Sequence, residues 1–79
     1  MDDVSRSILQ YLDEKQMPER ADLVSLEELE SALQIVPAFT EIALARLQSE
    51  HFVEVVDLGH EEDYVFITRE GRAWSEERG

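Results

Sequence analysis

Few side chains in this sequence have the types and spacing that chemistry requires. The strongest run is His60-Glu61-Glu62-Asp63, in which an imidazole and three carboxylates could bind a divalent metal ion. This run falls in a predicted turn, and a turn tip does not preorganise ligands, so a solvated acidic turn is the favoured interpretation. The other histidine, His51, follows a predicted helix and is interpreted as the residue that ends it.

Other signatures of enzymes are missing from the sequence. The chain has no cysteine, no serine nucleophile stands beside a base, and there is no glycine-rich phosphate loop. The two histidines are separated by a predicted strand, so they lack the His-x-x-x-His spacing of a metal-binding helix. We therefore expect a protein that is not an enzyme and that needs no metal and no cofactor.

Size and charge limit the remaining possibilities. With 79 residues, the chain can build one small domain, residues 1–79, around one core. No apolar run approaches the roughly 20 residues that cross a bilayer, and the acidic N-terminus is unlike a secretory signal. We therefore expect a cytoplasmic protein with no membrane partner. Nineteen acidic residues against seven basic ones give a formal charge of −12, which fits a basic protein partner or a high-salt cytoplasm.

Three helices are predicted from apolar residues that recur at helical spacing. The first covers residues 2–16 and can be capped by either aspartate at its start. The second begins at Ser25, which forms a capping box with Glu28. The third runs from Pro37 to about residue 50, since proline suits the first position of a helix. The side chains expected in the core are Val4, Ile8, Leu9 and Leu12 of the first helix, Leu26, Leu29, Ala32 and Leu33 of the second, and Phe39, Ile42, Ala43, Leu44 and Leu47 of the third.

A β-hairpin and a short closing helix are predicted to follow. Two β-rich runs, residues 52–58 and 64–68, are separated by five residues that include a glycine, which is typical of a hairpin. Residues 23–24 form a short extended piece earlier in the chain. Thr68 can cap the closing helix, which ends near residue 78, and Trp74 is expected to dock that helix on the core.

This order of elements resembles the winged helix-turn-helix family over nearly the whole chain. The most specific parts are ALARLQSEHFVEVV and YVFITREGRAW, where Ile67, Thr68, Gly71 and Arg72 fit the signature that closes the wing. The resemblance implies an α+β fold with a three-helix core, a two-stranded β-wing and a short C-terminal helix. It says little about function, because the same scaffold serves DNA readers and protein-contact modules.

Two departures from the family pattern bear on function. His51 stands where a glycine usually follows the recognition helix. The wing tip reads Gly-His-Glu-Glu-Asp, whereas DNA-binding wings commonly carry arginine or lysine for phosphates. Residues 52–64 contain five acidic residues and no basic one. We therefore expect a non-enzymatic, transcription-related regulatory module that acts mainly through protein contact or self-association.

A candidate protein interface follows from the alternation in the hairpin. If Leu58 pairs with Tyr64, then Val53, Val55, Val65 and Ile67 share one face, and only one face can lie on the helices. The opposite face would leave an apolar patch exposed, and such patches usually mark interfaces. The alternative is that the closing helix or the extended piece at residues 23–24 covers this face. The candidate interface residues are Val56, Leu58, Tyr64 and Phe66.

The alternative function is a sequence-specific DNA-binding transcription regulator, dimeric and adapted to a high-salt cytoplasm. In concentrated salt the counterion-release gain shrinks, so specificity can rest on base contacts and shape. The helix at residues 37–50 would then read DNA, although Arg46 is its single cation. The candidate DNA-reading residues are Thr40, Arg46, Gln48 and Ser49.

Overall fold

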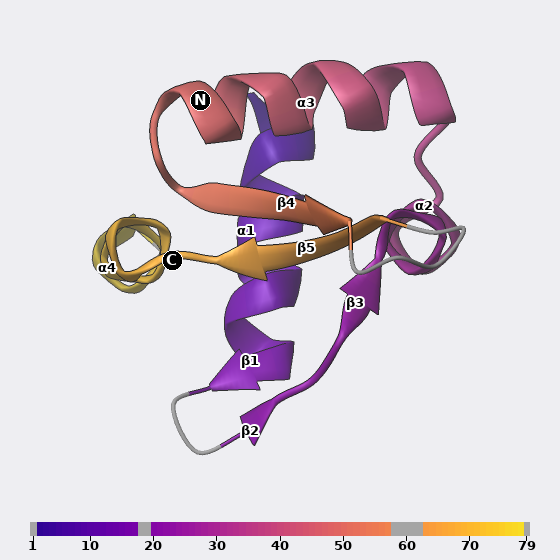
Figure 1. Ribbon diagram of the computed structural model, residues 1–79. Helices are drawn as coiled ribbons and strands as arrows, with labels where there is room; N and C mark the ends of the chain where they lie inside the picture. The colour runs from indigo at the N-terminus through magenta and orange to yellow at the C-terminus, as the bar shows by residue number, and fades with distance from the viewer. Residues whose placement is uncertain (1, 18–19, 58–62, 79) are drawn as a thin grey trace.

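A computed structural model describes residues 2–17, 20–57 and 63–78, where four helices pack with a three-stranded antiparallel sheet. Figure 1 shows the hairpin β4–β5 crossing α1, with α3 lying along one side of it and α4 and α2 near its two ends. The elements in chain order are α1 (Asp3–Lys15), β1 (Gln16–Met17), β2 (Arg20–Ala21), β3 (Val24–Ser25), α2 (Leu26–Leu33), α3 (Pro37–Ser49), β4 (Val53–Asp57), β5 (Asp63–Ile67) and α4 (Arg69–Arg78).

Side-chain caps define the starts of the first two helices. Asp2 caps α1, since its Oδ1 accepts a hydrogen bond from the backbone N–H of Ser5 at 2.8 Å. Ser25 caps α2 through a bond from Glu28 N to its Oγ at 3.1 Å, as predicted. The Glu28 carboxylate of the predicted capping box instead accepts from the Tyr11 hydroxyl at 2.5 Å, which ties α2 to α1.

The third helix begins and ends where the sequence predicts. Pro37 occupies its first turn, where the missing N–H costs nothing. At its end, His51 adopts the left-handed conformation with φ of 63°. The backbone N–H of Phe52 then donates to Leu47 O at 2.8 Å, and that of His51 to Gln48 O at 3.0 Å, which is a Schellman motif. The prediction that His51 ends this helix is confirmed.

The sheet has the order β3-β5-β4, so residues 24–25 form its third strand. In the hairpin Val56, not Leu58, lies opposite Tyr64, and Leu58 falls outside the described residues. This register differs from the predicted one by two residues, which leaves every side chain on its predicted face. The valines at 53 and 65 are buried in the core, and the residues that share their face, Val55 and Ile67, pack against it.

Most of the residues predicted for the core are buried or half-buried in it, but three are not. Ala32, Phe39 and Ile42 are exposed. Apolar residues occur on two adjacent sides of α3, and the helix turns the side containing Thr40 inward, so Phe39 and Ile42 face outward. The buried apolar residues are Ile8, Leu9, Leu12, Val24, Leu29, Ala43, Leu44, Leu47, Val53 and Val65.

The closing helix is held at the junction of α3 and the sheet. Thr68 caps it, because its Oγ1 accepts from Gly71 N at 3.0 Å and donates to His51 O at 2.5 Å. The ring of Trp74 lies 6.1 Å from that of Phe52, between centroids, and packs against the core. The predicted docking role of Trp74 is thus confirmed.

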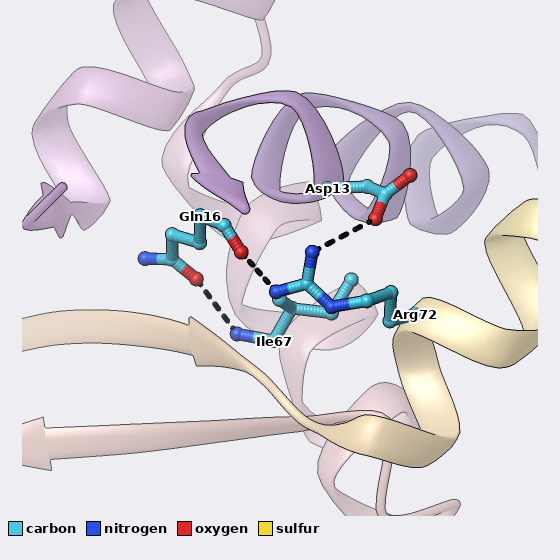
Figure 2. Close-up of polar contacts among 4 residues, drawn as sticks. All are labelled: Asp13, Gln16, Ile67 and Arg72. Atoms are coloured by element: carbon cyan, nitrogen blue, oxygen red, sulfur yellow. Dashed lines mark hydrogen bonds and ion pairs between the residues drawn. The ribbon is translucent and has the colours of Figure 1, made fainter. Parts of the chain in front are cut away.

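A polar network joins the C-terminal end of α1 to β5 and α4 (Figure 2). Gln16 is 3% exposed, and its Oε1 accepts from Ile67 N at 2.8 Å. Arg72 lies 3.5 Å from the Asp13 carboxylate and donates to the backbone carbonyl of Gln16. The network ties α4 and strand β5 to α1. None of the helices in the described part of the chain has the length and apolar character needed to cross a membrane.

Candidate nucleic-acid interface

The outer side of α3 is the surface that a helix-turn-helix would present to DNA. Its exposed residues include small side chains, Ala38 and Ala45, which permit close approach of another molecule. The predicted readers Gln48 and Ser49 are exposed on its C-terminal half. Arg46 lies on the same half, with its side chain 68% exposed. Three of the four predicted DNA-reading residues are therefore exposed on this half of α3, with Arg46 and Gln48 on opposite flanks of the helix because they are two residues apart.

Thr40 does not join them. It is fully buried, and its Oγ1 lies 3.4 Å from Val36 O, one turn earlier in the helix. The hydroxyl thereby satisfies its hydrogen bond inside the fold, as a buried threonine in a helix commonly does. The prediction that Thr40 reads DNA is wrong, because its position among the core side chains of α3 keeps it away from any groove.

Arg46 is engaged by the N-terminus of α1. Its guanidinium lies 3.1 Å from Asp2 Oδ2, while the other carboxylate oxygen caps α1. Hydrogen bonding from Ser5, and then the Arg46 guanidinium, hold the pKa of the Asp2 carboxyl below its ordinary value. Arg6 lies nearby: Arg6, Arg46 and Ser49 line one hollow of about 530 Å³. Sequence reasoning missed Arg6, since only the fold brings α1 beside the end of α3.

The arginines among the described side chains do not form one cationic ridge along α3. Arg46 bonds Asp2 at one end of α1, and Arg72 bonds Asp13 near the other end. At 1.5 Å per residue these two aspartates stand about 16 Å apart along the helix. The exposed described residues of the wing, including Glu54 and Asp63, are acidic. Arg46 and Arg72 therefore lie at opposite ends of α1, and of these two only Arg46 belongs to α3.

The predicted protein interface on the wing is only partly exposed. Val56, Tyr64 and Phe66 share the outer face of the hairpin and are half-buried, and Leu58 lies outside the described residues. Strand β3 pairs along the edge of β5, so it extends the sheet and does not lie over this face. The wing interface stays a prediction.

The predicted alternative of a metal site at the wing tip falls on residues 60–63, of which only Asp63 is described. Elsewhere in the described part of the chain, no three histidine, aspartate or glutamate side chains gather closely enough to hold a metal ion.

Solved structures of other proteins superpose on nearly the whole of this chain. No family model and no curated protein matches the chain. A provisionally assigned DNA-binding protein from Ralstonia eutropha superposes with a TM-score of 0.84 at 21% identity, over 98% of this chain and 95% of that one. The chain has the winged-helix fold.

Two other winged-helix matches are longer proteins. MepR, a transcription regulator from Staphylococcus aureus, matches with a TM-score of 0.84 at 17% identity, over 98% of this chain and 54% of MepR. ZitR from Lactococcus lactis matches with a TM-score of 0.79 at 18% identity, over 98% of this chain and 49% of ZitR. The winged-helix chain described here thus spans about half the length of these two proteins.

Proposed function

We propose that this winged-helix protein is a DNA-binding transcription regulator that reads DNA with the C-terminal half of α3. The observation that carries the proposal is the superposition of nearly the whole chain on transcription regulators, including MepR in a complex with DNA at a TM-score of 0.83 and 18% identity. From the sequence we favoured protein contact over DNA reading, and the superposition favours the reverse order.

The exposed side chains on this half of α3 suit the major groove. A guanidinium can bond the O6 and N7 atoms of guanine, and a glutamine amide can bond the N6 and N7 atoms of adenine. Arg46 and Gln48 are exposed on opposite flanks of α3, and the exposed Ser49 lies between them around the helix as a further donor or acceptor. Arg46 must first leave Asp2, and breaking such an exposed ion pair costs only about 0.2–1 kcal/mol.

The charge distribution determines how this protein would bind DNA. Each phosphate neutralised contributes about −0.9 to the slope of log K against log salt concentration. Arg6 and Arg46 line one hollow beside the C-terminal half of α3, and Arg69 directly follows Thr68, whose hydroxyl donates to the carbonyl of His51 at the end of that helix. We therefore expect a shallow slope, no steeper than about −3, and an affinity that depends mainly on base contacts and groove shape.

The proposal is tested by fluorescence anisotropy. Duplexes selected from a random pool are titrated with the wild-type protein at several salt concentrations. Gln48→Ala should weaken binding to the selected duplex by roughly 5- to 100-fold, as loss of a base contact does. Gln10→Ala removes an exposed glutamine from α1 and should leave binding unchanged. Failure to enrich any duplex, at low or high salt, would contradict DNA reading.

A second candidate is a regulatory module that acts through protein contact. The observation that favours it is the formal charge of −12 together with large apolar side chains exposed on α3. A regulator of this kind would give no enriched duplex but would still bind a partner protein through α3. The duplex selection therefore separates the two candidates.

A further inference from the structure

Three large apolar side chains stand exposed in a row at the start of α3. Val36, Phe39 and Ile42 are 54%, 59% and 53% exposed, and they recur every three residues. We call these three residues the α3 apolar patch. Single exposed apolar residues are ordinary, but a contiguous group of large ones on one helix usually marks a contact surface.

The patch continues into a hollow between α1 and the turn that joins α2 to α3. The hollow measures about 380 Å³. Val36 and Phe39 form one wall of it, and the half-buried side chains of Val4, Leu33 and Ile35 line the rest of its apolar surface. A ridge of exposed apolar residues beside an apolar hollow is the form of surface that receives one side of an amphipathic helix.

The charges around the patch indicate which partner it would accept. Asp3 is the charged residue among those that line the hollow, and the exposed Glu41 precedes Ile42 on α3. Arg46 follows Ile42 by one helical turn, but its charge is paired with that of Asp2 at 3.1 Å. The whole chain carries a formal charge of −12, so a second copy would bring strong like-charge repulsion to this surface. A partner with positive charges flanking its apolar residues would be attracted.

We propose that the α3 apolar patch and its hollow bind an amphipathic helix of a partner protein whose polar side is rich in lysine and arginine. An apolar side chain of that helix fills the hollow, its neighbours one turn away pack on Phe39 and Ile42, and its cations lie near Asp3 and Glu41. The patch occupies the first half of α3 and the DNA-reading residues the second. Since the 13 residues of α3 span about 20 Å, a bound partner also obstructs a duplex.

The test uses a synthetic probe. A fluorescein-labelled 16-residue peptide carries leucines at helical spacing on one side and lysines on the other, and its anisotropy reports binding. Two control peptides have the same leucines with glutamate for lysine, and the same composition with the leucine spacing scrambled. The lysine peptide should bind at least about tenfold more tightly than either control, because both charge and spacing contribute.

Matched variants locate the site. Phe39→Ala and Ile42→Ala should each weaken binding of the lysine peptide by about tenfold, as truncation of a contact hot spot does. Leu23→Ala is the control, since Leu23 is 54% exposed and lies outside the patch. Its affinity should stay within about twofold of the wild type. Because all three side chains are more than half exposed, the variants should fold, and circular dichroism verifies this.

Several results would overturn the proposal. Equal losses in the Phe39→Ala and Leu23→Ala variants would mean that binding is not located at the patch, and tight binding of the glutamate peptide would refute the basic partner. A dimer in sedimentation velocity that Phe39→Ala dissolves would make a second copy the occupant. Failure here is distinguishable from failure of DNA reading, because the peptide titrations contain no DNA and the duplex titrations contain no peptide.

Discussion

The side-chain amide of Gln16 pairs with the backbone of Ile67 as a neighbouring strand would. Its Oε1 accepts from Ile67 N at 2.8 Å, and its Nε2 donates to Val65 O at 2.8 Å and to Asp22 O at 3.1 Å. Strand β3 pairs with β5 only through residues 64–65. Gln16 thus bonds the backbone of β5 at Val65, where the pairing with β3 ends, and beyond it at Ile67, and it does so from the end of α1.

We expect Gln16→Ala to destabilise the fold by about 2–3 kcal/mol. The substitution leaves the Ile67 N–H and the Val65 carbonyl without their partner, and an unmet buried group costs about 1–3 kcal/mol. Urea unfolding followed by circular dichroism measures the change. Gln10→Ala, at an exposed position of the same helix, is the control and should change the free energy of unfolding by less than about 0.5 kcal/mol. Equal effects of the two substitutions would show that the amide bridge contributes nothing.

Gly71 is predicted to be irreplaceable for a steric reason. It is buried in α4, and a Cβ atom there would overlap the carbonyl oxygen of Phe52, which accepts a hydrogen bond from Thr68 N. Alanine favours a helix over glycine by about 1 kcal/mol, so propensity alone would make Gly71→Ala stabilising. We expect instead a loss of about 1–3 kcal/mol, since α4 must shift away from Phe52. Thermal unfolding tests this, with Glu70→Ala as an exposed neighbour, and a raised Tm would disprove the overlap.

The bond between Tyr11 and Glu28 predicts a dependence of stability on alkaline pH. The Glu28 carboxylate, by accepting this bond, raises the pKa of Tyr11 to about 12 from an ordinary value of 10.0. A raised pKa means that the folded state favours the neutral phenol. The stabilisation is therefore complete below pH 10 and is lost as the pH rises to about 12.

The expected size of this effect is about 0.5–1.5 kcal/mol, the usual net value of a hydrogen bond. Tyr11→Phe should be less stable than the wild type by this amount at neutral pH. The difference between the two proteins should shrink above pH 10, which urea titrations at a series of pH values would follow. Absorbance at alkaline pH of the Tyr64→Phe variant, which keeps Tyr11 as the single tyrosine, locates its ionisation directly. Ionisation near pH 10 would contradict the bond.

The features that could be predicted from the sequence are those that depend on neighbouring residues. The cap at Ser25, the start of α3 at Pro37 and the left-handed stop at His51 follow from local chemistry, and the structure confirms all three. The hairpin faces were also correct despite the register error, because a shift of two residues preserves the alternation.

Features that depend on distant residues could not be predicted. Apolar residues lie on two sides of α3, and spacing alone does not say which side meets α1. It predicts Phe39 in the core and Thr40 on the surface, whereas Phe39 is exposed and Thr40 is buried. Gln16 bonds residues 49 and 51 positions away. Arg46 bonds Asp2, which is 44 positions away in the sequence. The sequence alone therefore does not show that the Arg46 guanidinium already has a carboxylate partner.

That last pairing yields a prediction about DNA binding, which rests on the proposed function. Asp2→Asn removes the carboxylate that engages Arg46, while asparagine still caps α1 as well as aspartate does. Arg46 then becomes available to a phosphate or a guanine, and one negative charge leaves the reading surface. We expect a severalfold gain in affinity for the selected duplex and a salt slope steeper by about 1. Asp3→Asn, which removes an adjacent exposed charge not bonded to Arg46, separates the specific effect from the general one. An equal gain in both variants would show that the ion pair does not restrain Arg46, and a loss in Asp2→Asn alone would show that the pair orients the arginine for reading.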